Sequence, residues 1–470
     1  MTAVHAGDTK NPLEKIRRPK LLFLASPFPP LRAVACVRTW NIAKHLARSG
    51  WDVTVVTPHP SIYRNPDNPE KLSGQLEKEG IKRILTDHRW RCLRPESLTC
   101  WNSGPGWILG GTCRRVTEWL QVDRGIGWLK AAEQACASLT PDDADVILAT
   151  GSPFSSFKLA KRLSDKLGRP YVIDYRESWT ENIYASSRPR LRVIREEKRL
   201  LDGCAAVIIV SPSWAEALDR RFSIGAKLHV ITNGYDAQEM SRVRPYDFGH
   251  FAIVYAGSFY PPKRVITPFM AALRGIKDAT NSAHKDWYFH YFGTEESHVR
   301  EEAGKYGIMD RVILHGNVPR GEALSAVRGA NIAVVVTSIE DTLTKKDAGM
   351  IPAKLFESLG MKTPALIVGP AGADIDAIVE TAGSAHRFAG SEVDGMKSFI
   401  ISAMSGQVPG PKKTESYGWN ALAEKLSDIL RKAAGMPAGQ KQSYGIHSVT
   451  SVEQSPERRN YLSQMNWKCQ

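Results

Sequence analysis

The chain has 470 residues, of which 42% are hydrophobic and 24% charged, and this composition is typical of a soluble globular protein long enough for two domains of roughly 200 residues each. No stretch approaches the roughly 18 consecutive apolar residues of a membrane-spanning helix. The polar, basic segment 1–19 has no apolar stretch of the kind found in secretory signals, so we expect a disordered extension there.

The cysteines are seven in number and scattered, with no Cys-x-x-Cys pair. This pattern argues against both a disulfide framework and a zinc site. It favours a reducing compartment, and we expect the protein to be cytoplasmic.

The positive charge lies almost entirely in the first half. Residues 1–200 hold 33 Lys and Arg against 21 Asp and Glu, whereas the whole chain has a net charge of +14. Such asymmetry indicates an anionic partner, either membrane phosphates, a phosphorylated lipid or nucleic acid, although simple solubility explains it equally well. No nucleic-acid-binding motif is present, so we expect no nucleic-acid partner.

Segment 60–140 is less regular and combines arginines with five tryptophans, at positions 90, 101, 107, 119 and 128. Tryptophan is often buried in a core. Interleaved with basic residues, it also suits a surface that lies on an anionic bilayer.

The first half alternates between predicted strands and helices, as in doubly wound α/β proteins. The strands are expected at 20–25, 51–57, 145–149, 170–179, 205–210 and 228–231, and the helices at 34–49, 155–167, 188–201 and 213–222. The first turn has no Gly-x-Gly-x-x-Gly pattern, so we expect no dinucleotide cofactor. The strand at 170–179 places four candidate site residues at its carboxyl end: Asp174, Arg176, Glu177 and Trp179.

The aperiodic segment 242–249 is where we expect one domain to end and another to begin. A second alternating series follows, with strands at 251–255, 287–292, 312–314, 332–336 and 365–368 and a helix at 320–329. The expected domains are therefore 20–240 and 250–412. An amphipathic helix at about 416–434 and a polar tail at 435–470 complete the chain.

The segment 351–368 begins as a helix and ends as a buried strand, with Gly360 expected to end the helix. Lys354 and Glu357 lie three residues apart on this helix and therefore on neighbouring parts of one face. Such a pair is commonly a weak surface ion pair. The alternative is a glutamate that binds a ribose diol at the carboxyl edge of a parallel sheet.

Six short strings, in chain order, make this sequence resemble glycosyltransferase family 4. They are Phe28-Pro-Pro30 with Arg38, Val172-Ile-Asp-Tyr-Arg-Glu-Ser-Trp179, Ile231-Thr-Asn-Gly-Tyr-Asp236, Tyr255-Ala-Gly-Ser258 with Lys263, Leu314-His-Gly-Asn-Val318, and the segment 352–364. The resemblance covers roughly residues 20–434. It implies an α/β protein of the GT-B fold, with two Rossmann-like, doubly wound parallel-sheet domains facing a central cleft and the helix at 416–434 packing back on the first domain.

The resemblance also implies roles for individual residues. Lys263 would bind the donor phosphates as a catalytic group, together with Asp174, Arg176 and Glu177 from the first domain. Glu357 would accept hydrogen bonds from the ribose, and further donor-binding residues would be Lys354, Gly257, Ser258, Arg264, Gly316, Asn317, Val318, Gly349, Met350 and Ile351. Arg38, Trp179 and Asn233 would lie on the acceptor side. No metal and no cofactor are expected, with a UDP- or GDP-sugar as co-substrate.

Two departures from the family pattern concern the donor site. Gly349 stands where many members have a glutamate, and Ser258 stands where an arginine is usual, so that Arg264 would supply the second positive charge. The function implied is retaining transfer of a sugar to a glycan or lipid-linked acceptor in cell-surface polysaccharide biosynthesis, at the inner face of the membrane. A non-catalytic scaffold with a degenerate donor site and a nucleotide-sugar 2-epimerase are the alternatives.

Overall fold

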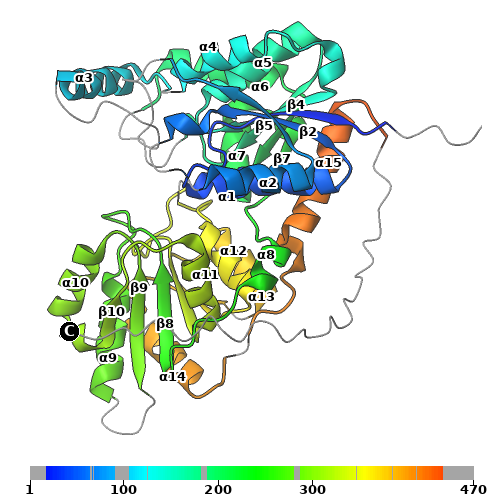
Figure 1. Ribbon diagram of the computed structural model, residues 1–470. Helices are drawn as coiled ribbons and strands as arrows, with labels where there is room; N and C mark the ends of the chain where they lie inside the picture. Colours follow the sequence, from blue (N-terminus) through cyan, green and yellow to red (C-terminus); the bar gives the residue numbers. More distant parts are fainter. Residues whose placement is uncertain are drawn as a thin grey trace, which may run out of the picture.

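A computed structural model describes residues 17–63, 66, 68–89, 105–123, 125–181, 188–279, 286–345, 347–383, 385–408 and 410–437. The chain forms two α/β lobes, each built on its own parallel sheet (Figure 1). The two parallel-sheet domains that the sequence predicts are therefore confirmed.

The first sheet has seven parallel strands in the order β3-β2-β1-β4-β5-β6-β7. Its central strands are mostly apolar and buried along nearly their whole length, as expected for a parallel sheet covered by helices on both faces. The strand bounds are β1 (Lys20–Leu24), β2 (Asp52–Pro58), β3 (Lys82–Thr86), β4 (Val146–Gly151), β5 (Tyr171–Tyr175), β6 (Ala206–Ile209) and β7 (Leu228–Val230).

The helices of this half include four that the sequence analysis did not assign: α2, α3 and α4, in the irregular tryptophan-rich segment, and α8, after the last strand of this half. The bounds are α1 (Val34–Arg48), α2 (Pro69–Glu79), α3 (Pro105–Leu120), α4 (Ile126–Ala135), α5 (Ser155–Leu167), α6 (Leu191–Gly203), α7 (Pro212–Phe222) and α8 (Ala237–Arg242).

The second sheet has six parallel strands in the order β10-β9-β8-β11-β12-β13. They are β8 (Phe251–Ala256), β9 (Trp287–Phe292), β10 (Val312–Leu314), β11 (Ile332–Val336), β12 (Ala365–Val368) and β13 (Ala385–Phe388). The helices are α9 (Thr267–Ala279), α10 (Glu296–Lys305), α11 (Arg320–Gly329), α12 (Ala353–Met361), α13 (Ile375–Ala382) and α14 (Val393–Met404).

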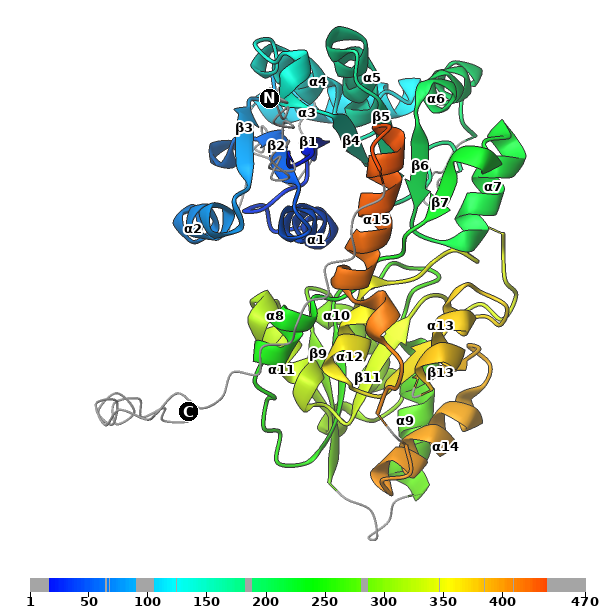
Figure 2. The same ribbon diagram turned by 90° about the vertical axis from the view of Figure 1, so that its right-hand side faces the viewer.

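The last helix, α15 (Trp419–Ala433), leaves the second domain and lies along the first (Figure 2). Its apolar face, including the fully buried Trp419, belongs to the same core cluster as Trp51 and the first strands. The Trp51 indole donates a hydrogen bond of 2.9 Å to the hydroxyl of Ser427. The amphipathic pattern of this helix therefore arises because one face covers the first sheet.

Two details differ from expectation. The helix α12 continues through Gly360 to Met361, and Lys362 adopts the left-handed conformation at its end, with φ of 59°. Gly360 is needed for close packing instead, because a Cβ there would come within 2.6 Å of the Tyr235 ring. Arg18, which we assigned to a disordered extension, donates hydrogen bonds to three backbone carbonyls around Trp51. Segments 1–16 and 438–470 lie outside the described residues.

Candidate functional site

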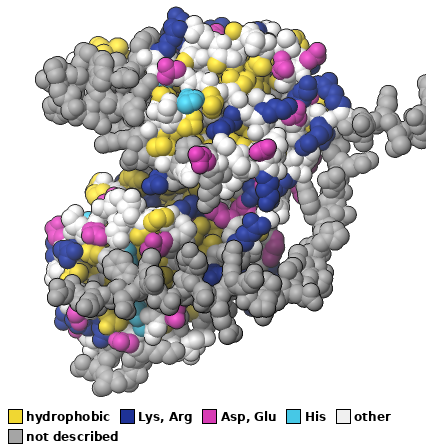
Figure 3. All heavy atoms as spheres, in the orientation of Figure 1, with side chains coloured by type: hydrophobic (Ala, Val, Ile, Leu, Met, Phe, Trp, Pro, Cys, Tyr) yellow, Lys and Arg dark blue, Asp and Glu magenta, His cyan; other side chains and the backbone are white. Residues whose placement is uncertain are grey.

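The carboxyl ends of the second sheet's strands point toward the first domain, and the surface is hollowed between the two lobes (Figures 1 and 3). In open α/β sheets, ligands bind at this edge because the loops and helix amino termini converge there. The predicted donor-site residues of the second domain lie in loops on this edge and in the first half of α12.

Lys263 lies in the loop between β8 and α9, and its ammonium contacts two carboxylates. Its Nζ is 2.8 Å from Asp347 and 2.9 Å from Glu340, both in the loop between β11 and α12. These hydrogen bonds raise the pKa of Lys263, so it remains a cation through the neutral range. The loop thus surrounds a half-exposed positive charge with negative ones.

Lys354, in the first turn of α12, reaches under the loop that follows β8. Its Nζ donates to the hydroxyl of Tyr255 at 3.3 Å and lies 4.3 Å from the centre of that ring. Gly257 makes room for it: a Cβ on Gly257 would come within 2.0 Å of the Lys354 ammonium, and its φ of +134° disfavours any side chain. Burial and the neighbouring Arg264 lower the pKa of Lys354 to about 7.

Arg264 and Ser258 complete this cluster. The Tyr255 hydroxyl donates to the backbone carbonyl of Ser258 at 3.0 Å, and the Arg264 guanidinium lies 4.9 Å from the centre of the Tyr260 ring. The Nε of Arg264 is buried and has no hydrogen-bond partner within the described parts of the chain. A second cation therefore lies near Lys354, although Ser258 itself has no charge.

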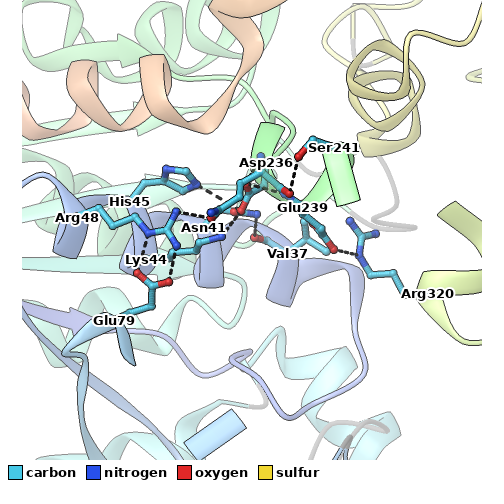
Figure 4. Close-up of polar contacts among 11 residues, drawn as sticks. Val37, Asn41, Lys44, His45, Arg48, Glu79, Asp236, Glu239, Ser241 and Arg320 are labelled. Atoms are coloured by element: carbon cyan, nitrogen blue, oxygen red, sulfur yellow. Dashed lines mark hydrogen bonds and ion pairs between the residues drawn. The ribbon is translucent and has the colours of Figure 1, made fainter. Parts of the chain in front are cut away.

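Glu357, the predicted ribose ligand, forms an ion pair with Arg320 at the start of α11, and Arg320 also contacts Glu239 of α8 at 3.4 Å. The amino terminus of α8 is capped by the carboxylate of Asp236. Figure 4 shows how this junction continues into the first domain, where Lys44 contacts the same carboxylate. The predicted ribose site is thus connected to the first domain through α8.

The predicted base-binding loop follows β10. Gly316 has a left-handed backbone, with φ of +68°, and accepts a hydrogen bond from Gly293 through its carbonyl. Asn317 is exposed, whereas Val318 packs against the apolar cluster beside α11.

Next to this loop lies a row of three histidines that the sequence analysis did not bring together. The rings of His250, His290 and His315 are joined by hydrogen bonds of 2.8 and 2.9 Å. Their positions are 40 and 25 residues apart in sequence, so only the pairing of β8, β9 and β10 makes them neighbours. Burial lowers the pKa of the central ring, His290, to about 3, so this ring is neutral at physiological pH.

Gly349 is the position where a glutamate is usual in the family. A Cβ there would lie 2.4 Å from the ring of Trp214 in α7, so the loop backbone packs directly on the first domain. Met350 packs against the apolar core of the first domain, and Ile351 against the cluster beneath α12. Asp374 also reaches across, accepting hydrogen bonds of 2.6 and 2.8 Å from Ser213. These contacts join the two domains on the α7 side.

Two predicted site residues of the first domain, Arg38 and Asp174, bind each other. Asp174 is completely buried and Arg38 is 3% exposed, and their closest atoms are 2.6 Å apart. Arg38 also donates to the carbonyls of Ile231 and Thr232 and lies near Asn233 at 3.5 Å. The three residues therefore form one buried junction among α1, β5 and the segment after β7.

The other three candidates follow β5 directly. The Arg176 guanidinium donates to the carbonyls of Gly151 and Ser152, and burial lowers its pKa. Glu177 is half-buried, and Trp179 stacks on Phe154 with ring centres 5.0 Å apart.

A comparison with protein-family models supports the resemblance. Residues 36–239 match the model described as Glycosyltransferase Family 4. This part of the chain is therefore similar to family 4 glycosyltransferases. The match covers the first domain, in which the resemblance rested on the strings around Arg38, Asp174 and Asn233.

Solved structures show the same fold over nearly the whole chain. Sucrose-phosphate synthase from Thermosynechococcus elongatus has a TM-score of 0.58 and 14% identity, covering 88% of this chain and 99% of that one. Anabaena Alr3699/HepE in complex with UDP-glucose has a TM-score of 0.52 and 14% identity, covering 88% of this chain and 98% of that one. A putative UDP-N-acetylglucosamine 2-epimerase from Listeria monocytogenes has a TM-score of 0.53 and 13% identity, covering 90% of this chain and 99% of that one. These likenesses establish the GT-B fold.

A search among curated proteins finds no match to this chain. Within the described ranges, no group of three or more His, Cys, Asp or Glu side chains could hold a metal ion. Nor does any helix in those ranges have both the length and the apolar character needed to cross a bilayer.

Proposed function

We propose that the protein is a glycosyltransferase that transfers a sugar, with retention of configuration, from a UDP- or GDP-sugar to a glycan or lipid-linked acceptor in cell-surface polysaccharide biosynthesis. The observation that carries the proposal is a group of three cations at the carboxyl edge of the second sheet: Lys263 and Arg264 in the loop after β8, and Lys354 at the start of α12, next to Gly257. A departing nucleoside diphosphate gains negative charge, and fixed cations stabilise that charge in the transition state.

In this proposal the protein mainly positions the two substrates and offsets charge. The departing phosphate oxygen accepts the proton of the acceptor hydroxyl as the new glycosidic bond forms on the same face of the sugar. Glu357 and the loop at 316–318 hold the nucleoside, which the similarity to the UDP-glucose complex of Anabaena Alr3699/HepE supports.

The surface of the first domain supports a further part of the proposal, attachment to an anionic membrane. Helix α3 extends outward from this domain (Figure 1), and Trp119 is 69% exposed. Leu191, 67% exposed, belongs to α6, and the guanidinium of Arg190 lies 4.5 Å from the centre of the Trp119 ring. Exposed apolar side chains next to arginines suit an interface with anionic lipids. Trp128, by contrast, is fully buried.

The test of the function is a thermal-shift panel with UDP, GDP, ADP and their common sugar conjugates at millimolar concentration. A ligand that binds only the folded state raises the melting temperature. We expect a clear shift with the UDP or GDP series, and loss of turnover but not of stability in Lys263→Ala. Absence of any shift, with no release of nucleotide from any sugar conjugate, would overturn the proposal. Conversion of a nucleotide sugar to its 2-epimer would favour the epimerase instead.

A further inference from the structure

The carboxylate of Glu357 is held by a residue from another helix. Arg320, at the start of α11, donates a hydrogen bond from its Nη1 to Oε1 of Glu357. Lys354, three residues before Glu357 on α12, donates instead to the hydroxyl of Tyr255. The orientation of the Glu357 side chain therefore depends on α11 rather than on a cation of its own helix.

The guanidinium of Arg320 is fixed from a second side by α8. Its Nε lies 3.4 Å from Oε1 of Glu239, so two nitrogens of one planar group contact carboxylates on two different helices. Figure 4 shows the contact between Arg320 and Glu239. A guanidinium suits this bridge because its N–H groups form a rigid fork, whereas a lysine has a single ammonium.

Helix α8 is itself anchored on both sides. The carboxylate of Asp236 accepts a hydrogen bond of 3.2 Å from the backbone N–H of Glu239, and it also contacts Lys44 of α1. Farther along α11, Arg328 donates to the backbone carbonyl of Met240 at 2.5 Å. The helix that supports Arg320 is therefore held to the first domain and to α11.

Two observations distinguish this ion pair from an ordinary surface pair, which contributes little. The Glu357 side chain is only 19% exposed, against 40% for Glu239. Arg320 also comes two residues after Val318, where the predicted base-binding loop ends. One arginine thus adjoins both parts of the predicted nucleoside site, the base loop and the ribose ligand.

We propose that Arg320 is a positioning residue of the donor site, which holds Glu357 in the orientation in which its carboxylate accepts hydrogen bonds from the ribose. The inference rests on the proposed function, because it takes Glu357 as the ribose ligand. A carboxylate has about four acceptor sites, so the ion pair through Oε1 leaves enough of them for a diol. Without Arg320, the ligand itself would have to order a flexible glutamate, and this lowers affinity.

The opposite role for Arg320 would be to block the ribose site until the donor displaces it. The two roles predict opposite changes when the arginine is removed. Loss of a positioning residue weakens nucleotide binding, whereas loss of a blocking residue strengthens it.

The experiment measures ribose selectivity by isothermal titration of the full chain with UDP and 2′-deoxy-UDP and, in a second series, with GDP and 2′-deoxy-GDP. The ratio of the two dissociation constants reports contacts to the 2′-hydroxyl, and a general loss of stability does not change it. We expect the wild-type protein to bind the deoxynucleotide about tenfold more weakly, because one hydrogen bond to a charged group is lost. In Arg320→Met, we expect about tenfold weaker binding of the ribonucleotide and a ratio of roughly 2.

Two further variants locate the effect. The matched control is Arg328→Met, which removes the same type of residue about two turns farther along α11, where it contacts α8 through the Met240 carbonyl. We expect this variant to keep the wild-type ratio. Glu239→Gln weakens the support of Arg320 but leaves Glu357 intact, so we expect an intermediate ratio. Because Glu239 is 40% exposed, this variant tests the inference even where Arg320→Met does not fold.

The wild-type ratio in Glu239→Gln and in folded Arg320→Met would overturn the inference, and so would tighter binding by Arg320→Met. An equal loss of selectivity in Arg328→Met would also overturn it, because the effect would then come from loosening of α11. A ratio near one in the wild-type protein, or failure of both ribonucleotides to bind, would instead count against the proposed function and the ribose role of Glu357.

Discussion

The buried pair Arg38–Asp174 allows a catalytic role for Asp174 to be distinguished from a structural one. Its carboxylate accepts hydrogen bonds from Arg38 at 2.6 and 3.2 Å and from the hydroxyl of Thr150 at 2.8 Å. Asp174→Ala would leave the Arg38 guanidinium buried without a counter-charge. Breaking a buried ion pair from one side costs about 3–5 kcal/mol. For a domain of this size, that free energy lowers the melting temperature by roughly 10 °C.

The assay is thermal unfolding followed by circular dichroism, together with nucleotide binding measured well below the transition. We expect Asp174→Ala to melt at the lower temperature and to bind nucleotide normally, since the predicted donor residues lie in the second domain. The control is Asp165→Ala. Asp165 is 64% exposed and forms a surface ion pair with Lys161, so its loss lowers the free energy of unfolding by only about 0–1 kcal/mol. If Asp174→Ala has the melting temperature of the wild-type protein but has lost turnover, the structural role of Asp174 is refuted and the catalytic role is favoured.

Three further predictions concern the domain junction, the ribose site and pH. Glu357→Gln releases Arg320 and weakens nucleotide binding about tenfold in calorimetry, and unchanged affinity would remove its ribose role. Gly349→Glu places a side chain against Trp214, so we expect a loss of about 1–3 kcal/mol in chemical denaturation together with lower turnover; a fully stable and active variant would contradict this packing. Burial raises the pKa of Glu197 from 4.5 to about 7, so folding favours its protonated form and stability falls by roughly 3 kcal/mol as pH rises from 4.5 to 7. The Glu197→Gln variant should lack that dependence in melting curves recorded across this range.

The positions of most strands and several helices could be predicted from the sequence. The strands at 287–292, 332–336 and 365–368 have the predicted bounds, because a strand buried on both faces requires an uninterrupted apolar run. The edge strand at 312–314 was also predicted, since all three of its residues are apolar. Strands β3 and β13 were missed, since both lie at sheet edges and carry polar residues on their exposed positions.

The candidate site was only partly determined by the sequence. Local strings brought Lys263, Gly257 and Lys354 into one hypothesis, and the structure places them on one edge of the second sheet. The strings could not show that Arg38 and Asp174, 136 residues apart, neutralise each other in a core. Nor could they show that Glu357 pairs with Arg320, 37 residues away.

The sequence by itself determined which segments form buried strands, which helices have an apolar face, and which short strings match the family, because these depend on neighbours within a few residues. Only the tertiary structure decided which charges meet. A pKa of about 7 for Lys354 arises from burial under Gly257 and from Arg264, which lies 90 positions away in sequence. Desolvation and charge proximity depend on distance in space, so the same lysine would keep its ordinary pKa on an exposed helix.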